Sequence, residues 1–388
     1  MKRLIFAPGI CQIINAAAAL AQERADGGGG AGHEDVLVLY GSYPFSDMSR
    51  AMEQAARCAW NWRDIRWAEE VLVCHFPTRR FAPIARQVLH EKLGSTADEV
   101  WVSKLGLEPA KLVLRAYPES RVVLYEDGAE EFIPQEILCG MSRLKRLKPS
   151  GWPGGLWREL GHWAPDPECL DLDGVCTRDR RRATVLYSFL EQYLGLPSYL
   201  AGVPVVRVSG EILKERLQAL TPLLDAAACR QPEKRPEEAV VLFLPQPFAV
   251  LFLTTEDEYA LYRSAVMEIL KKGYTILWKE HPRETTPLAP RLQEETGDER
   301  LKILRVRQQM PVECLVAGWT LAGVVSVSST SLFYLKGLYG YPAYTAAAGI
   351  GMDRWLKRTD AELARMFVQT LPGLDRLPPA EGREKDQL

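Results

Sequence analysis

The first third of the chain alternates short apolar runs with longer amphipathic segments. The apolar runs, rich in β-branched and aromatic residues, are residues 3–7, 35–40, 71–75, 99–103 and 121–125. Between them, residues 48–60 and 109–116 repeat their apolar positions at the period of a helix. Strands that alternate with helices predict a parallel sheet covered by helices.

The same alternation returns after residues 226–238 (AAACRQPEKRPEE), whose prolines and charges indicate a linker. Strands are expected at residues 240–244, 274–278, 302–304 and 324–327, with a helix at 256–272. We therefore predict an α/β fold with an N-terminal Rossmann-like domain at 1–228, a C-terminal one at 237–375 and a polar tail at 376–388. Ligands of two such domains bind at the carboxyl ends of strands facing an interdomain cleft.

Composition removes several classes of function. The net charge of −2 lacks the basic footprint of a nucleic-acid binder. The eight cysteines form no CxxC pair and the five histidines no ligand cluster, so we expect reduced thiols and no metal site. No apolar stretch approaches the roughly 20 residues that span a bilayer. A cytoplasmic protein is expected, with peripheral contact at the inner membrane as a second expectation.

The segment 140–161 is basic and rich in glycine, proline and tryptophan. This composition is suited to binding an anionic ligand or a membrane surface. An ordinary solvated loop with partly buried indoles is an equally good interpretation.

A carboxylate motif follows the expected strand at 121–125. Glu126, Asp127 and Gly128 combine two acids with a glycine that permits a sharp turn. Asp127 is a candidate general base, because a positioned carboxylate can accept the proton of an attacking hydroxyl. The alternative is an ordinary Asp-Gly turn.

A histidine motif follows the expected strand at 274–278. Pro282 restricts the backbone after His281, which places the imidazole at a strand end. Together with Lys279 and Arg283, His281 could bind a phosphate. When protonated, it can also offset the negative charge on a departing phosphate oxygen. A structural histidine is the alternative.

A serine cluster follows the expected strand at 324–327. Ser328 and Ser329 precede an expected helix, where hydroxyls and free amides bind anions or cap the helix. Upstream, Glu313 is a candidate to accept hydrogen bonds from ribose hydroxyls. Alternatively, its charge interacts favourably with the dipole at a helix start.

The order EDG, HP, PVE and SSTS resembles the bacterial sialyltransferases and polysialyltransferases of GT-B architecture. The opening APGICQ, with Gln12 and Asn15, is similar to the Pro-x-Gln turn of that group, although it is longer by two residues. Gln246, in LPQP, is similar to its Gln-Pro after the first strand of the second domain. The glycine-rich insert at 27–32 and the segment 140–161 depart from the pattern.

The resemblance implies an inverting transferase that needs neither metal nor cofactor. It moves sialic acid from CMP-sialic acid to a glycan acceptor of the capsule or lipooligosaccharide kind. Asp127 would be the base, His281 would contact the CMP phosphate, Ser328 and Ser329 would hold that phosphate or the donor carboxylate, and Glu313 would bind ribose. Further substrate contacts are expected from Gln12, Asn15, Glu126, Gly128, Gln246 and Pro282.

Two alternatives stay open. The same architecture could use another donor, such as CMP-Kdo or a UDP-sugar. A non-catalytic paralogue that only binds nucleotide or glycan would keep the fold without the chemistry.

Overall fold

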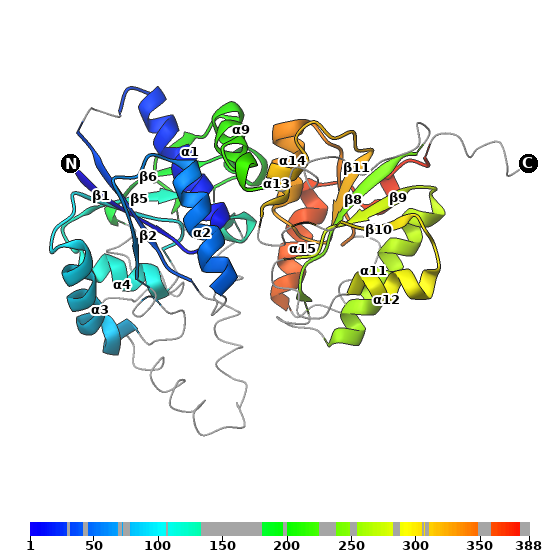
Figure 1. Cartoon of the computed structure of the whole chain (residues 1–388), viewed down its shortest axis with the longest axis horizontal. Helices are drawn as coiled ribbons and strands as arrows, with labels where there is room; N and C mark the ends of the chain where they lie inside the picture. Colours follow the sequence, from blue (N-terminus) through cyan, green and yellow to red (C-terminus); the bar gives the residue numbers. More distant parts are fainter. Residues whose placement is uncertain are drawn as a thin grey trace, which may run out of the picture. The chain divides into compact units, whose positions relative to one another are not determined.

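The structure is a computed structural model of the whole chain. It describes residues 1–28, 32–41, 46–68, 72, 78–105, 108–132, 181–196, 200–224, 238–248, 254–281, 288–304, 306, 310–347 and 358–380. They form two compact units, Met1–Leu220 and Thr221–Leu388 (Figure 1). The expected linker and the basic tryptophan segment lie almost wholly outside the described residues.

Unit 1 is built on a parallel sheet with the strand order β3-β2-β1-β4-β5-β6-β7. Its strands are β1 Lys2–Ala7, β2 Glu34–Leu39, β3 Asp64–Trp67, β4 Glu99–Val102, β5 Arg121–Tyr125, β6 Ala183–Ser188 and β7 Val205–Arg207. Every described pairing is parallel. The chain order reverses between β1 and β4, which is the topological switch point where α/β sheets bind ligands.

The helices of unit 1 cover both faces of this sheet, with α1 and α2 on one side and α3 and α4 on the other (Figure 1). Their bounds are α1 Ile10–Ala25, α2 Ser46–Ala59, α3 Thr78–Leu93, α4 Glu108–Ala116, α8 Glu191–Leu194 and α9 Gly210–Gln218, with the 3₁₀ turn η1 Ala129–Phe132. The alanines 16–19 of α1 are fully buried, and their small side chains allow the helix to lie close to its neighbours.

The sequence pattern located most of these elements but not all of them. A strand was expected at 71–75, and the third strand is instead at Asp64–Trp67. Of the expected strand only residue 72 lies among the described residues. The pattern also missed β6 and β7.

Unit 2 repeats the parallel plan with the order β10-β9-β8-β11-β12. The strands are β8 Val240–Leu244, β9 Thr275–Trp278, β10 Leu301–Ile303, β11 Gly323–Ser326 and β12 Ala343–Thr345. The helices are α11 Thr255–Lys271, α12 Leu288–Thr296, α13 Val312–Leu315, α14 Ser331–Tyr339 and α15 Arg358–Thr370, with the 3₁₀ turns η3 Thr221–Leu223 and η5 Leu374–Arg376. The expected strands of this unit are present, and β12 is one that the pattern missed. Its switch point lies between β8 and β11.

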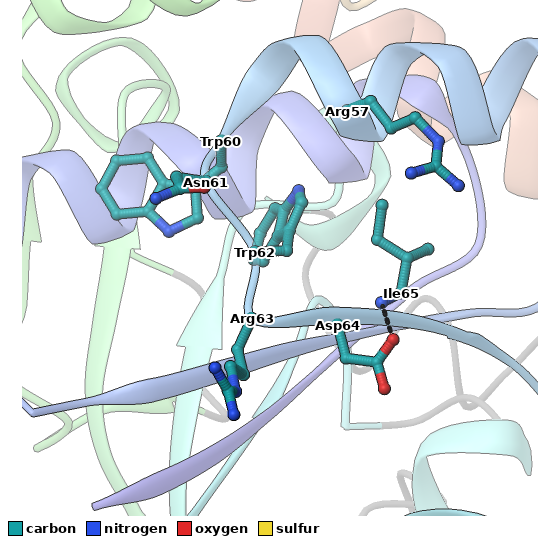
Figure 2. A pocket seen from close by; sticks show the side chains of 7 residues that line it. All are labelled: Arg57, Trp60, Asn61, Trp62, Arg63, Asp64 and Ile65. Atoms are coloured by element: carbon teal, nitrogen blue, oxygen red, sulfur yellow. Dashed lines mark hydrogen bonds between the residues drawn. The ribbon is translucent and has the colours of Figure 1, made fainter.

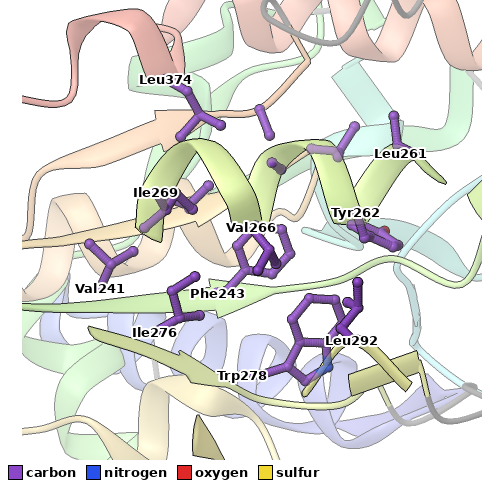
Figure 3. Close-up of a cluster of buried hydrophobic side chains, with 14 of the residues drawn as sticks. Val241, Phe243, Leu261, Tyr262, Val266, Ile269, Ile276, Trp278, Leu292 and Leu374 are labelled. Atoms are coloured by element: carbon purple, nitrogen blue, oxygen red, sulfur yellow. The ribbon is translucent and has the colours of Figure 1, made fainter. Parts of the chain in front are cut away.

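Unit 2 is stabilised by an aromatic core that joins β8, β9 and α11 (Figure 3). Phe243 and Trp278 stack with ring centroids 4.8 Å apart, and Tyr262 meets Trp278 edge-on at 5.5 Å. All three side chains are buried. The parallel sheet and covering helices of each unit confirm the prediction of an α/β fold with two Rossmann-like domains.

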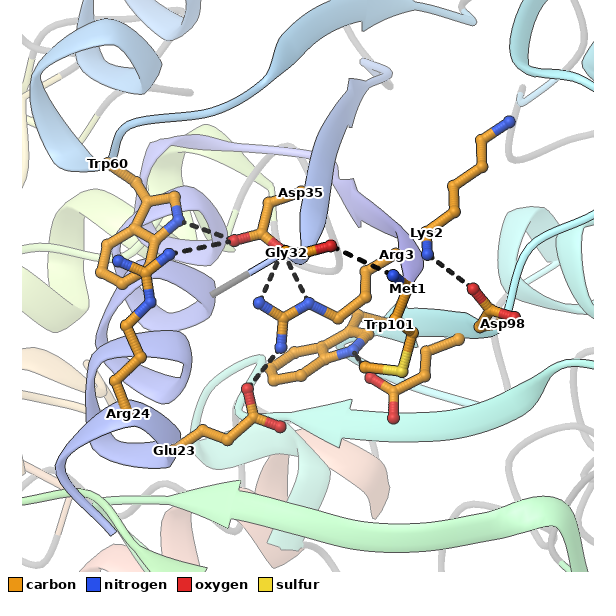
Figure 4. Close-up of polar contacts among 11 residues, drawn as sticks. Met1, Lys2, Arg3, Glu23, Arg24, Gly32, Asp35, Trp60, Asp98 and Trp101 are labelled. Atoms are coloured by element: carbon orange, nitrogen blue, oxygen red, sulfur yellow. Dashed lines mark hydrogen bonds and ion pairs between the residues drawn. The ribbon is translucent and has the colours of Figure 1, made fainter. Parts of the chain in front are cut away.

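Unit 1 encloses a charged cluster at the amino edge of its sheet (Figure 4). Arg3, which is fully buried, donates from Nε to Asp35 Oδ1 at 2.6 Å and pairs with Glu23. Trp60 Nε1 donates to Asp35 Oδ2 at 3.1 Å. Burial raises the pKa of Glu23, while the charge of Arg3 opposes the shift. Arg3 therefore compensates two carboxylates that water does not fully solvate.

We predict that Arg3→Ala lowers the free energy of unfolding of unit 1 by about 3–5 kcal/mol, because the carboxylates of Asp35 and Glu23 lose the charge of Arg3 and Asp35 keeps the longer pair with Arg24, at 3.6 Å. Urea denaturation followed by circular dichroism measures the change. Arg66→Ala breaks an exposed pair with Asp64 and serves as the control, with an expected loss of about 0–1 kcal/mol. Equal losses for the two variants would contradict the compensating role of Arg3.

Candidate functional site

The EDG motif lies at the carboxyl end of β5, as its sequence position predicts. β5 ends at Tyr125, and the chain then turns through Glu126, Asp127 and Gly128 into η1. Gly128 has φ 152°, a region that residues with a side chain rarely adopt. Asp127 is partly exposed and follows directly on buried strand residues.

The carboxylate of Asp127 is held by residues that follow two neighbouring strands. Its Oδ1 accepts from Ser103 Oγ at 2.8 Å and from Gln12 Nε2 at 3.2 Å. Ser103 comes directly after β4, and Gln12 lies in the first turn of α1, after β1. Because β1, β4 and β5 are consecutive in the sheet, all three residues meet beside the switch point of unit 1.

The position of Gln12 depends on the glycine that precedes its helix. A Cβ on Gly9 would lie 2.7 Å from Gln12 Oε1, closer than atoms tolerate. Gln12 Nε2 also donates to the backbone oxygen of Asp127 at 3.0 Å, so the amide holds both the side chain and the backbone of that residue. The predicted residue Gln12 is thus brought to the predicted base.

Asn15 and Glu126 are brought to the same turn but face the interior. Asn15 Nδ2 donates to Glu126 O at 3.0 Å. Glu126 is 3% exposed, and its Oε2 accepts from Ser188 Oγ at 2.6 Å and from the amides of Phe189 and Leu190 at 2.9 and 2.7 Å. In this structure Glu126 anchors the turn between β6 and α8 beside Asp127.

In unit 2 the predicted residues again follow neighbouring strands. Gln246 comes after β8, His281 after β9, and Ser328 and Ser329 after β11. These strands are consecutive in the sheet, so their carboxyl ends share one edge. The backbone of Gln246 is held by Tyr262, whose hydroxyl lies 2.6 Å from both its N and its O.

The serine turn is shaped by Ser326, the last residue of β11. Ser326 Oγ donates to Leu244 O at 2.6 Å and accepts from Ser329 N at 3.2 Å. It thereby ties the end of β8 to the start of the turn that leads into α14. Ser328 and Ser329 are each 9% exposed at the amino end of this helix, whose dipole favours anions.

Glu313 lies within the protein near a buried lysine. The side chains of Glu313 and Lys279 are 5% and 6% exposed. Burial raises the pKa of Glu313, whereas a hydrogen bond with Ser331, its own backbone amide and the charge of Lys279 oppose the shift. The cluster links the strand end that carries His281 to the first turn of α14. Pro282 and Arg283 lie outside the described residues.

Three site residues were missed from the sequence. Ser103 contacts the predicted base, Ser188 contacts Glu126, and Ser326 shapes the serine turn. Each is a serine at the last position of a strand or directly after one, and each strand is visible in the sequence as an apolar run. That placement is the signal that could have revealed them. Among the described residues, no group of three or more His, Cys, Asp or Glu is arranged to hold a metal ion.

Solved structures of similar fold are found at very low identity. A UDP-GlcNAc 2-epimerase from Neisseria meningitidis bound to UDP-GlcNAc is 11% identical, with TM-score 0.54, over 95% of this chain and 91% of that chain. The S. aureus MnaA-UDP co-structure is 10% identical, with TM-score 0.50, over 95% and 87%. The GT-B domain of a Photobacterium damselae sialyltransferase is 12% identical, with TM-score 0.49, over 95% and 96%. The first two likenesses place the chain among proteins with two Rossmann-like domains.

The sequence itself decides the family. Residues 109–348, more than half of the 388, match the alpha-2,8-polysialyltransferase (POLYST) family, and the chain belongs to it. The predicted resemblance is thereby confirmed, and the protein is a glycosyltransferase of the sialyltransferase type. No protein with a curated description matches the chain in sequence. Within the part of the chain that is described, no helix is both long and apolar enough to cross a bilayer.

We predict that Glu313→Gln changes how the stability of unit 2 depends on pH. The folded pKa of Glu313 lies above its ordinary value of 4.5, so this carboxyl lowers stability as the pH rises from 4.5 through the folded value. The variant lacks this contribution, and its free energy of unfolding relative to the wild type should increase with pH across that window. Urea denaturation at several pH values measures the difference, and a difference that is independent of pH would contradict the assignment.

Proposed function

We propose that the enzyme transfers sialic acid from CMP-sialic acid to a glycan hydroxyl with inversion at the anomeric carbon. The observation that carries the proposal is the carboxylate of Asp127 at the switch point of unit 1, held by Gln12 and Ser103 in a chain of the polysialyltransferase family. An acid placed there is suited to accept a proton from an attacking hydroxyl.

Asp127 is proposed to act on the acceptor. The acceptor oxygen attacks the anomeric carbon of the sialic acid, and its proton passes to the carboxylate of Asp127. Gln12 and Ser103 both donate to Oδ1, so they orient the carboxylate before substrate arrives. Such preorganisation lowers the barrier because no rearrangement is needed in the transition state.

Unit 2 is proposed to act on the leaving group. As the bond between the anomeric carbon and the phosphate oxygen breaks, its electron pair goes to CMP. His281 donates to that oxygen, while Ser328, Ser329 and the amides at the start of α14 bind the phosphate or the donor carboxylate. These residues offset the charge on CMP without a metal ion, and no cofactor enters the step.

Glu313 is proposed to contact the ribose. Burial favours its neutral form, which can donate as well as accept a hydrogen bond. Gln246 is proposed to contact the nucleotide next to Glu313, because Tyr262 fixes the backbone of Gln246 at the end of β8.

The acceptor is proposed to be a surface polysaccharide or lipooligosaccharide, reached from the cytoplasm by peripheral contact with the inner membrane. The resemblance to bacterial polysialyltransferases supports this choice.

We expect Asp127→Asn to lower kcat by roughly 10²–10⁴-fold while CMP binding is retained, because the amide cannot accept the acceptor proton. Transfer is measured by product analysis with CMP-sialic acid and a panel of galactosides and sialosides. Asp26→Asn, at an exposed position, is the matched control and should transfer at the wild-type rate.

Calorimetry with CMP, UDP and GDP tests the donor. If UDP binds more strongly than CMP, the proposal of a CMP-sugar donor is rejected and the UDP-sugar alternative is favoured. An unchanged kcat in Asp127→Asn would remove Asp127 from the mechanism.

Ser103→Ala should lower kcat by about tenfold with little change in KM, because a hydrogen bond to a charged group contributes on the order of 1.5 kcal/mol. Ser103→Thr keeps a hydroxyl at this position and should recover much of the rate. A purely structural role for Ser103 would instead lower thermal stability and leave kcat unchanged.

A further inference from the structure

Unit 1 carries a cavity that the proposed reaction does not use (Figure 2). It encloses about 370 Å³ between the end of α2 and the start of β3, in the size range of small-ligand sites. Because its loop precedes β3, the cavity lies at the amino edge of the sheet, whereas Asp127 lies at the carboxyl edge. Strands of six residues separate these edges by roughly 20 Å.

Trp62 presents an aromatic ring to this cavity (Figure 2). Its Nε1 donates to Ala56 O at 2.8 Å in the last turn of α2, so the indole is held by its polar edge while the side chain stays partly exposed. The neighbouring Trp60 is different, because it is buried, bonded to Asp35 and covered by the Arg24 guanidinium 4.2 Å from its ring centroid. Trp62 is thus the ring available to a ligand.

The charge at the cavity is positive. The carboxylate of Asp64 is occupied, since it accepts from Ile65 N at 2.9 Å and from Arg66 Nε at 2.6 Å. Arg57 meets Glu53 at 3.7 Å, but both side chains are exposed and such pairs contribute little. Arg63 is exposed at the same rim. Arg57 and Arg63 therefore line the pocket together with Trp62.

We propose that this pocket binds the carboxylated ring of an acidic glycan, away from the site of transfer. Guanidinium groups bind carboxylates through paired hydrogen bonds, and an indole face packs against the apolar face of a sugar ring. A neutral sugar has no carboxylate and cannot form ion pairs with Arg57 and Arg63. The inference rests on the proposed function, because an α-2,8-linked sialic acid polymer carries one carboxylate on every ring.

Binding of an α-2,8-linked sialic acid tetramer to the full chain, by calorimetry without any nucleotide sugar, tests the proposal. Arg57→Ala, Arg63→Ala and Trp62→Ala should each weaken binding by about tenfold. Arg86→Ala removes an exposed arginine from α3, outside the pocket, and should bind as the wild type does. Thermal unfolding confirms that each variant is folded. If Trp62→Ala does not fold, the two arginine variants decide.

A neutral tetrasaccharide of similar length and inorganic phosphate are the comparison ligands. The proposal is supported if only the sialic acid tetramer binds and the pocket variants lose it. Equal binding of phosphate or of the neutral sugar, or wild-type affinity in Arg63→Ala and Arg57→Ala, would overturn it. Pocket-dependent binding without transfer would reject the proposed function alone, and transfer without pocket-dependent binding would reject this inference alone.

Discussion

The hydrogen bonds that hold Asp127 depend on one constraint, the parallel order β1-β4-β5. Parallel neighbours end at the same edge, so residues that follow them meet even when they are far apart in the chain. Gln12 and Asp127 are 115 positions apart and Ser103 and Asp127 are 24 apart, yet both donors reach one carboxylate oxygen. A shift of one strand by one residue would turn these side chains to the opposite face and remove the arrangement.

Unit 2 uses the same constraint for a different chemistry. Its switch point lies between β8 and β11, and Ser326 joins the ends of those strands by bonding to Leu244 O and to Ser329 N. The turn then leads into α14, where the amides of Leu332 and Phe333 donate to Ser329 O and Thr330 O, each at 3.0 Å. Unit 1 gathers two hydrogen-bond donors around one carboxylate, and unit 2 places two serines before the start of a helix. Each half of the proposed chemistry therefore depends on the strand order of its own sheet.

Buried polar groups are paired at the turns of both units and at the opposite edge of the first sheet. Glu126 satisfies a hydroxyl and two amides, and without it these donors would be buried and unpaired. Arg3 compensates Asp35 and Glu23 at the other edge of the same sheet. Glu313 responds to burial by a raised pKa, since the neutral acid is easier to bury than the carboxylate. Such groups restrict each turn to one arrangement, because alternatives would leave charges or donors without partners.

The sequence by itself determined the α/β class, the two repeats of strands and helices, and the positions of EDG, HP and SSTS after apolar runs. Those features are local, since an apolar run followed by glycine, proline or a hydroxyl specifies a strand and its end. Only the tertiary structure decided that Ser103 contacts Asp127, that Glu126 faces inward, and that β3 is residues 64–67. These facts depend on strand order, register and burial, which contacts between distant residues determine and no local pattern contains.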